Sequence, residues 1–381
     1  MKSIYLDNAA TTSVDKKVIK SMLPYFNLKY GNASSLHLLG EEAKRELESA
    51  RKYIAKALNA KYREIIFTSS GTEANNTILK GLFWHNYPAK NHIITTKIEH
   101  DCILSTCKWL ETFGAKITYL NVDAEGFVDL QQLEQAITDK TIVVSVIHGN
   151  NEVGTIQDLK AIGDICKRKS TLFHTDACQS FTKVLIDVIK QKIDFVAINA
   201  HKIHGPKGIG AFYIKQGIKI TPLLHGGGHE FGLRSSTENV PGIIGFAQAV
   251  RISNSKSMKK ITKLRDRLIE GILRIPNAKF NGAKGEKRLC NNVNISFKNI
   301  EGESLGNLLN VRGIFTSTGS ACSSNSLKPS HVLRALGLGR LEANSSIRLS
   351  LSKFNTEEEV GIVIKEITRA VEKLRKINSI K

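Results

Sequence analysis

The stretch Ile142-Val143-Val144-Ser145-Val146-Ile147 consists of β-branched apolar residues interrupted by a single serine. A run of this kind is typical of a strand at the centre of a parallel sheet, where both faces are covered by other elements. We therefore predict a buried central strand over residues 141–147.

Short β-branched runs and helical patterns alternate on both sides of this strand. Such a βαβα alternation predicts an α/β fold with a mostly parallel sheet, here of the seven-stranded type, flanked by helices. The expected strands are 64–68, 92–96, 116–122, 171–175, 195–198 and 210–214, and the expected helices are 73–84, 102–113 and 159–169.

The pattern changes after about residue 255, where helices and strands no longer alternate regularly. The expected elements are helix 258–273, strand 290–297, helix 304–312, strand 346–351 and helix 357–376. We predict a large domain over residues 13–255 and a smaller α+β domain formed by residues 1–12 and 256–381.

The chain is strongly basic, with 55 Lys and Arg against 35 Asp and Glu and a formal net charge of +20 over 381 residues. The segment Arg251–Arg288 holds 12 basic and 3 acidic residues. Apolar residues recur there at helical spacing, which predicts a solvated helix, although a surface for nucleic acid or an acidic protein is an alternative. Since no nucleic-acid-binding motif accompanies the charge, we do not expect direct nucleic-acid binding.

No uncharged apolar run reaches 18 residues, and the first residues lack the apolar core of a signal peptide. We therefore expect a cytoplasmic protein without membrane contact. None of the six cysteines forms a Cys-x-x-Cys pair, so we expect neither a metal site nor a disulfide framework.

Lys202 lies in the turn-rich cluster Asn199–Gly208, directly after a predicted strand. Ligands bind at this edge of open α/β sheets, although a lone lysine is most often a surface charge. Asp176 and Gln179 also follow a predicted strand. The aspartate could cap a helix or pair with a cationic ring nitrogen. A lysine amine together with such an aspartate is what pyridoxal phosphate chemistry requires.

The segment Thr68–Glu73 (T-S-S-G-T-E) leads from a predicted strand into a predicted helix. The free N–H groups of a helix N-terminus suit a phosphate, although the same residues form an ordinary capping sequence. The segment matches neither a Walker A loop nor a GxGxxG fingerprint, which argues against a nucleotide or dinucleotide.

Seven segments carry a more specific pattern: Tyr5–Thr12, Ser70–Asn76, Glu99-His100, Asn150–Gly154, His174–Ser180, Ala200–Lys202 and Gly319–Ser323. In this order, and over essentially the whole chain, they resemble the cysteine desulfurases of the NifS/IscS group, fold-type I pyridoxal-phosphate enzymes of the class-V aminotransferase family. The resemblance implies conversion of L-cysteine to L-alanine, with the sulfur transferred to an enzyme cysteine as a persulfide.

The resemblance also implies a role for each matching residue. Lys202 would hold pyridoxal 5'-phosphate covalently and move the substrate Cα proton. Asp176 would pair with the ring nitrogen, Gln179 with the ring hydroxyl, and His100 would stack on the ring and transfer protons. The other implied contacts are Gly71, Thr72, Asn151 and His201 with the cofactor, Thr237 with the phosphate across a homodimer, and Asn151 and Arg348 with the substrate.

Cys322 lies in Ser317–Ser326, where eight of ten residues are Ser, Thr, Gly or Asn. This composition predicts an exposed loop, in which a thiol is a plausible nucleophile once ionised, the alternative being an incidental loop cysteine. By resemblance, Cys322 would attack the sulfur of bound L-cysteine and pass it to an acceptor, either an iron–sulfur scaffold protein or a tRNA-thiolation protein. It could also contact an iron–sulfur cluster during transfer.

Two other hypotheses remain open at this point. One is a different pyridoxal-phosphate lyase or aminotransferase on the same fold, such as a selenocysteine lyase. The other is a nucleic-acid-binding protein, which would leave the spacing of Lys202 and Asp176 unexplained. Asn199 stands where the resembling family commonly has a phosphate-binding Ser, and we expect its amide to substitute for the hydroxyl.

Overall fold

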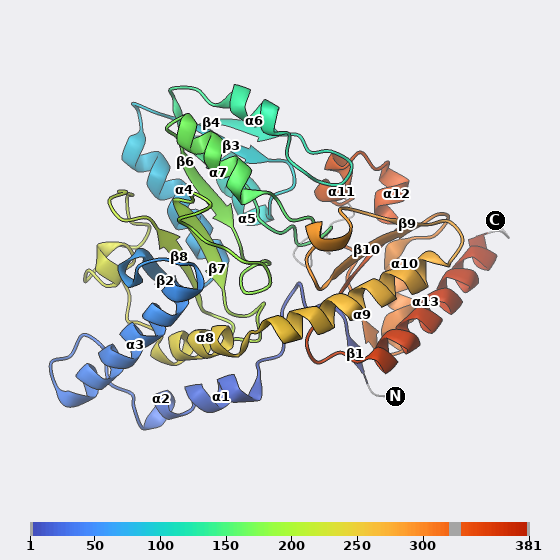
Figure 1. The fold of residues 1–381 in the computed structure, drawn as a ribbon, viewed down its shortest axis with the longest axis horizontal. Helices are drawn as coiled ribbons and strands as arrows, with labels where there is room; N and C mark the ends of the chain where they lie inside the picture. The colour runs from blue at the N-terminus through green and yellow to red at the C-terminus, as the bar shows by residue number, and fades with distance from the viewer. Residues whose placement is uncertain (1–2, 320–328, 379–381) are drawn as a thin grey trace.

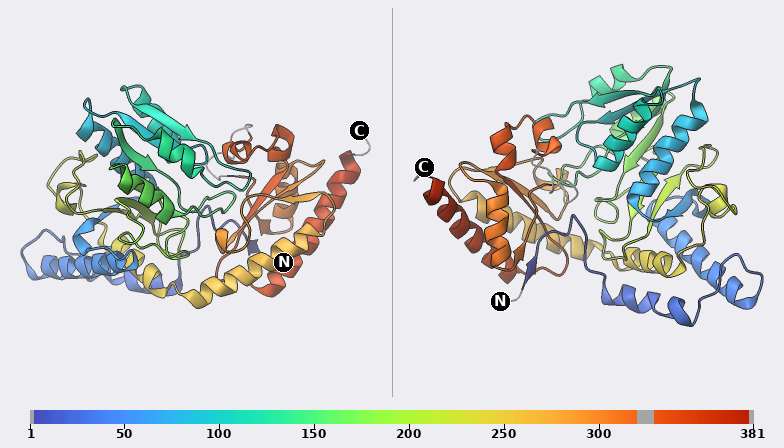
Figure 2. Two further views of the ribbon diagram at one scale, coloured as in Figure 1. Left: turned by 45° about the horizontal axis from the view of Figure 1, so that its top comes forward. Right: turned by 180° about the vertical axis from the view of Figure 1, so that it is seen from behind.

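The structure is a computed structural model that describes residues 3–319 and 329–378. Figure 1 shows a larger α/β body and a smaller body that contains the last third of the chain. In both views of Figure 2, the consecutive helices α8 (Val240–Ile252) and α9 (Ser255–Leu273) connect the two bodies.

The larger body is built on a seven-stranded sheet of order β2-β8-β7-β6-β5-β3-β4. β8 is antiparallel to both of its neighbours, and the other strands run in one direction. The predicted mostly parallel α/β sheet is therefore confirmed. Its strands are β2 (Ile65–Thr68), β3 (His92–Thr96), β4 (Lys116–Leu120), β5 (Thr141–Ser145), β6 (Leu172–Asp176), β7 (Phe195–Asn199) and β8 (Gly210–Ile214).

Helices cover both faces of the sheet, as predicted (Figure 1). Successive residues of β5 show why that strand is apolar throughout, because Val143 packs into the cluster on one face and Val144 into the cluster on the other. The first face is covered by α4 (Gly71–Asn86) and α5 (Asp101–Glu111), and the second by α3 (Leu38–Ala57), α7 (Leu159–Arg168) and α8.

Three further helices complete the larger body. α1 (Lys16–Met22) and α2 (Pro24–Asn27) pack on α8, and α6 (Leu130–Ala136) packs on α7 and β4. The helices before residue 60 were not predicted from the sequence, although α3 buries Ala43, Leu47, Ala50 and Ile54 at helical spacing.

The smaller body combines a three-stranded antiparallel sheet, β12-β10-β9, with α9, α10 and α13. Ile4 and Leu6 belong to its apolar cluster, and β1 pairs in parallel with β11. These contacts agree with the predicted α+β unit, whose boundaries remain a prediction. Its elements are β1 (Ile4–Tyr5), β9 (Ala278–Phe280), β10 (Asn292–Phe297), α10 (Gly302–Val311), β11 (Ile314–Phe315), α11 (His331–Ala335), α12 (Arg340–Asn344), β12 (Ser346–Ser350) and α13 (Glu357–Asn378).

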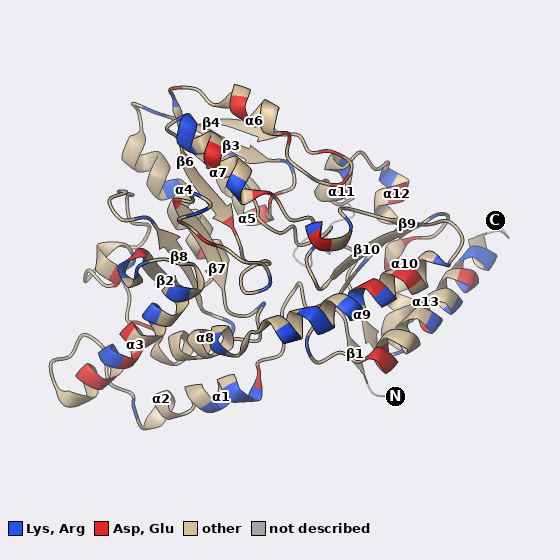
Figure 3. Cartoon of the chain, viewed as in Figure 1, with Lys and Arg blue, Asp and Glu red and all other residues tan. Residues whose placement is uncertain are grey.

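The basic segment that starts at Arg251 forms a solvated helix, as its spacing predicted. Ile261, Leu264 and Leu268 on α9 are buried, whereas Lys259 and Lys263 are exposed. Figure 3 shows Lys and Arg at intervals along this helix. Among the helices of the described residues, none has the length and apolarity needed to span a membrane.

Candidate active site

The carboxyl ends of several neighbouring strands meet at one edge of the large sheet and enclose a pocket of about 160 Å³. Eight of the predicted site residues line this pocket. They are Gly71 and Thr72 after β2, His100 after β3, Asn151 after β5, Asp176 and Gln179 at the end of β6, and His201 and Lys202 after β7. The structure therefore brings these eight predicted residues together, and their roles remain predictions.

The start of α4 forms one wall of the pocket. Ser70 caps the helix, since its hydroxyl accepts a hydrogen bond from the N–H of Glu73 (3.1 Å). The N–H groups of Gly71 and Thr72 have no partner within the helix, so they are available to an anion. A Cβ on Gly210 of β8 would lie 2.7 Å from the Ser70 carbonyl carbon, so a glycine there lets the cap approach the sheet closely.

Asp176 is buried and held through both carboxylate oxygens. The backbone N–H of Cys178 donates to Oδ1 (2.8 Å), and the amide Nδ2 of Asn75 donates to Oδ2 (2.8 Å). These donors fix the plane of the carboxylate at the pocket wall. A carboxylate in this position can pair with a cationic group of a bound ligand.

His100 serves as the N-cap of α5, and its Nδ1 accepts a hydrogen bond from the N–H of Cys102 (3.1 Å). With Nδ1 acting as the acceptor, the neutral ring carries its proton on Nε2. Burial lowers the pKa of His100, and the nearby charge of Lys202 lowers it further. The imidazole is therefore neutral at pH 7 and can exchange a proton with a ligand.

Glu99 lies next to His100 in the chain and is fully buried. Burial raises the pKa of Glu99 to about 8, despite hydrogen bonds that its Oε1 accepts from the Thr96 hydroxyl (2.7 Å) and the Ile147 N–H (2.9 Å). Glu99 is thus mostly uncharged at neutral pH.

The N-terminal segment lies along the pocket and holds two of its residues. Gln179 donates from Nε2 to the carbonyl oxygen of Ala9 (2.8 Å), and Thr12 donates from its hydroxyl to the carbonyl oxygen of His201 (2.8 Å). Burial lowers the pKa of His201 to about 4, so this imidazole is also neutral at pH 7.

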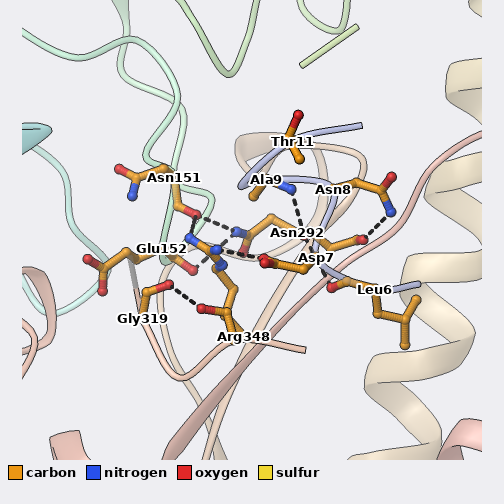
Figure 4. Close-up of polar contacts among 12 residues, drawn as sticks. Leu6, Asp7, Asn8, Ala9, Thr11, Asn151, Glu152, Asn292, Gly319 and Arg348 are labelled. Atoms are coloured by element: carbon orange, nitrogen blue, oxygen red, sulfur yellow. Dashed lines mark hydrogen bonds and ion pairs between the residues drawn. The ribbon is translucent and has the colours of Figure 1, made fainter. Parts of the chain in front are cut away.

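Arg348 on β12 lies beside the pocket, outside the residues that line it. As Figure 4 shows, its guanidinium donates to Asp7 Oδ1 (2.8 Å) and to the carbonyl oxygen of Asn151 (3.2 Å). Its Nε has no partner among the described residues. A buried guanidinium with an unused donor suits a carboxylate ligand. The contact of Arg348 with the substrate itself remains a prediction.

Besides Arg348, two other predicted site residues have no described place in the pocket wall. Thr237 is exposed in the loop before α8 and does not line the pocket. Cys322 lies outside the described residues.

Two cysteines that line the pocket, Cys102 and Cys178, are protonated thiols at neutral pH. Burial and the charge of Asp176 raise the pKa of Cys102 to about 12 and also raise the pKa of Cys178. Within residues 3–319 and 329–378, no group of three or more His, Cys, Asp or Glu side chains is arranged to hold a metal ion.

Sequence reasoning missed two residues that shape the site. Asn75, which holds Asp176, lies one helical turn after Gly71, and this i, i+4 spacing is a signal that could have found it. Asp7, which holds Arg348, is 341 residues away in the chain, and no local pattern connects them.

Comparison with known proteins gives a consistent result over the whole chain. The family model described as "Aminotransferase class-V" matches residues 4–363. A protein of Methanosarcina thermophila named cysteine desulfurase IscS is 48% identical over 99% of this chain and 94% of its own length. A protein of the same name from Clostridium botulinum (strain Hall) is 49% identical over 99% of this chain and 96% of its own length.

Solved structures agree with these sequence relatives. A structure titled "NIFS-LIKE PROTEIN" superposes with a TM-score of 0.92 at 42% identity and covers 97% of this chain and 100% of its own. A second, titled "SspA in complex with cysteine", has a TM-score of 0.84 at 38% identity and covers 93% of this chain and 100% of its own.

Proposed function

The chain belongs to the class-V aminotransferase family, and from this premise we propose that it is a pyridoxal-phosphate-dependent cysteine desulfurase. The observation that carries the proposal is that one pocket gathers Lys202, Asp176 and His100 with the first residues of α4. Relatives at 48–49% identity named cysteine desulfurase favour this activity over the lyase and aminotransferase alternatives.

The residues of the pocket fit pyridoxal phosphate. Two buried amide oxygens, Oδ1 of Asn151 and Asn199, have no hydrogen-bond partner among the described residues, and their side chains line the pocket. Unsatisfied buried polar atoms are costly, which supports a pocket built for a polar ligand. Lys202 would bind the cofactor aldehyde covalently, and Gly71 and Thr72 would hold its phosphate.

When bound, the cofactor would supply an electron sink for the bonds at the substrate Cα. Asp176 would keep the ring nitrogen protonated, because an ionised carboxylate favours the charged form of its partner. The Lys202 amine would remove the Cα proton, and the neutral His100 would move a proton through Nε2. Arg348 would orient the substrate through its α-carboxylate.

Cys322 is the proposed nucleophile. The five described cysteines are poor candidates for this role, because their thiols are protonated at neutral pH. Burial raises the pKa of each of the five described thiols, to about 12 for Cys107 and Cys166 as for Cys102. In the reaction, the Cys322 thiolate attacks the substrate sulfur, an S–S bond forms, and the C–S bond of L-cysteine breaks. The carbon skeleton takes up a proton and leaves as L-alanine, and Cys322 keeps the sulfur as a persulfide.

We also propose that the chain acts as a homodimer in the cytoplasm and passes its sulfur to an acceptor protein for iron–sulfur cluster assembly or tRNA thiolation. Large apolar side chains are exposed around α1 and α2 and before α3, among them Phe26, Leu28 and Leu36, which supports a subunit interface there. The exposed Thr237 is consistent with a contact in the partner's site. Light scattering on the full chain tests the dimer, whose expected mass is twice 42.1 kDa.

The reaction is tested by incubating the cofactor-loaded chain with L-cysteine and a thiol reductant. We expect one alanine and one sulfide for each cysteine consumed. Cys322→Ala should reduce both products on the order of 100-fold or more, because the acceptor of the sulfur is gone. Cys166→Ala, which alters a buried thiol of α7 outside the pocket, is the matched control and should retain the rate.

A Cys322→Ala variant that still releases sulfide at the wild-type rate would refute the proposed nucleophile. The cofactor assignment has its own readout. Borohydride should link pyridoxal phosphate to the wild-type chain and not to Lys202→Ala, and equal labelling of both would exclude Lys202 as the attachment point.

A further inference from the structure

Asn75 contacts the pocket carboxylate from within helix α4. Its side chain is fully buried, and Nδ2 lies 2.8 Å from Asp176 Oδ2 and 3.2 Å from Cys102 Sγ. Its Oδ1 has no hydrogen-bond partner among the described residues. The amide nitrogen therefore has two partners and the amide oxygen has none.

The chemistry of the partners fixes the orientation of this amide. An ionised carboxylate only accepts hydrogen bonds, so Asn75 must present its nitrogen to Asp176. The two hydrogens of Nδ2 then go to Asp176 and Cys102, and both donors are used. A buried amide oxygen without a donor is destabilising, so an apolar residue would suit this helix position better if packing alone mattered. We conclude that the donor half of the amide carries the role of this residue.

The two donors to Asp176 come from different elements. Cys178 N–H belongs to the turn that follows β6, and it would hold Oδ1 in any variant that keeps the backbone. Asn75 Nδ2 comes from α4, the helix whose first residues Gly71 and Thr72 line the same pocket. The amide of Asn75 thus connects the Asp176 carboxylate to α4, the helix whose first residues would hold the cofactor phosphate.

We propose that Asn75 is a positioning residue that orients Asp176 toward the cofactor ring nitrogen. The inference rests on the proposed function and deepens it, because it names the residue through which the ring partner is held. Without the Asn75 donor, Oδ2 of Asp176 is free to rotate away, and the ion pair with the ring nitrogen weakens.

The test compares two ligands on the cofactor-free full chain. One is pyridoxal phosphate, and the other is its analogue with the ring nitrogen replaced by CH. In Asn75→Leu, which keeps the same number and branching of side-chain heavy atoms and has no donor, the dissociation constant of pyridoxal phosphate should rise about tenfold. The constant of the analogue should stay within about twofold, since that ring offers Asp176 no cation.

Two further variants distinguish the loss of the donor from a general effect of the substitution on folding. Asn75→Ala removes the same donor with a smaller side chain and should show the same selective loss. Asn86→Leu replaces an asparagine at the far end of the same helix, where its amide only caps the Leu82 carbonyl oxygen, and it should bind both ligands as the wild type does.

Equal losses for both ligands in the Asn75 variants would show a purely structural role and overturn the inference, as would no loss for either ligand. A wild-type chain that binds both ligands equally well would instead show that Asp176 does not pair with the ring nitrogen. That result would refute the proposed pairing of Asp176 with the ring nitrogen, and with it the role inferred for Asn75.

Discussion

Gly71 packs directly against the Cys178 thiol at the floor of the pocket. A Cβ built on Gly71 would lie 2.3 Å from Cys178 Sγ, far inside van der Waals contact. Gly71→Ala should therefore destabilise the chain by about 1–3 kcal/mol in urea unfolding, because the thiol or the start of α4 must move. A displaced helix start should also weaken pyridoxal phosphate binding.

A double variant separates the clash between the new Cβ and Cys178 Sγ from any other effect of alanine on the free energy of unfolding. In Gly71→Ala combined with Cys178→Gly, the sulfur is gone, so the Gly71→Ala step should cost less than it does in the wild-type background. Equal costs of that step in the two backgrounds would mean that the thiol is not what excludes a side chain at position 71.

The site residues that could be predicted from the sequence lie close together in the chain or at the ends of predicted strands. Asp176 ends β6 and Lys202 follows β7, and the parallel sheet brings those strand ends together. Arg348 was identified through the resemblance alone, and its partner Asp7 was not found at all. Their contact depends on how the segment after β1 lies along β12, where Asp7 bridges Ser350, and no local pattern encodes this.

At the scale of elements, the buried pair Arg51–Glu230 connects α3, β2 and the short 3-10 helix η2 (Glu230–Gly232). Arg51 donates from both terminal nitrogens to the Glu230 carboxylate (2.6 and 2.7 Å) and from Nη1 to the Ile65 carbonyl oxygen (2.7 Å). Glu230 Oε2 also accepts from the N–H of Phe67 (2.7 Å), which satisfies a donor of the edge strand β2.

Breaking one side of this pair should be costly. Arg51→Met leaves the buried Glu230 carboxylate without a cation, and Glu230→Gln leaves the buried Arg51 guanidinium with only the partly exposed Glu48 (3.1 Å) as an anionic partner. We expect Glu230→Gln and Arg51→Met each to lower the free energy of unfolding by about 3–5 kcal/mol. The double variant should cost less than the sum, since neither charge is then left alone. Additive costs in urea unfolding would contradict a coupled pair. Lys160→Met, which removes an exposed pair with Asp164, is the control and should change stability little.

Element type was more predictable than element boundaries. The apolar run that predicted β5 continues through Val146 and Ile147, whereas the strand ends at Ser145. Both later residues are buried, so composition could not distinguish the strand from the buried chain that follows it. β1 has only two residues and exists because it pairs with β11, more than 300 residues later in the sequence.

For the molecule as a whole, the net charge of +20 does not determine the fold. The buried histidines, in contrast, determine how the free energy of unfolding depends on pH. Burial lowers the pKa of His148 and His174 to about 4, and both rings are fully buried. Burial also lowers the pKa of His201 and His204 to about 4. These four groups are neutral in the native state at pH values where the unfolded chain protonates them.

The sign of the effect follows from proton counts. Between the native pKa of about 4 and the ordinary value of 6.5, the unfolded state binds more protons than the native state does, so stability falls as pH falls through this window. Glu99 opposes the trend with one group, because its raised pKa of about 8 makes the native state the proton-rich one above pH 4.5. The four histidines outweigh this single carboxyl group.

We therefore predict a marked loss of unfolding free energy between pH 7.5 and pH 5.5, to which each fully buried histidine contributes about 1.3 kcal/mol. Urea unfolding at several pH values measures it. His174→Gln should reduce the pH dependence by about one histidine's share, because glutamine cannot take up the proton, whereas His85→Gln on the exposed side of α4 should leave the curve unchanged. If His174→Gln keeps the full wild-type slope, the native ring is already protonated near pH 6, and burial does not exclude the charge as the structure requires.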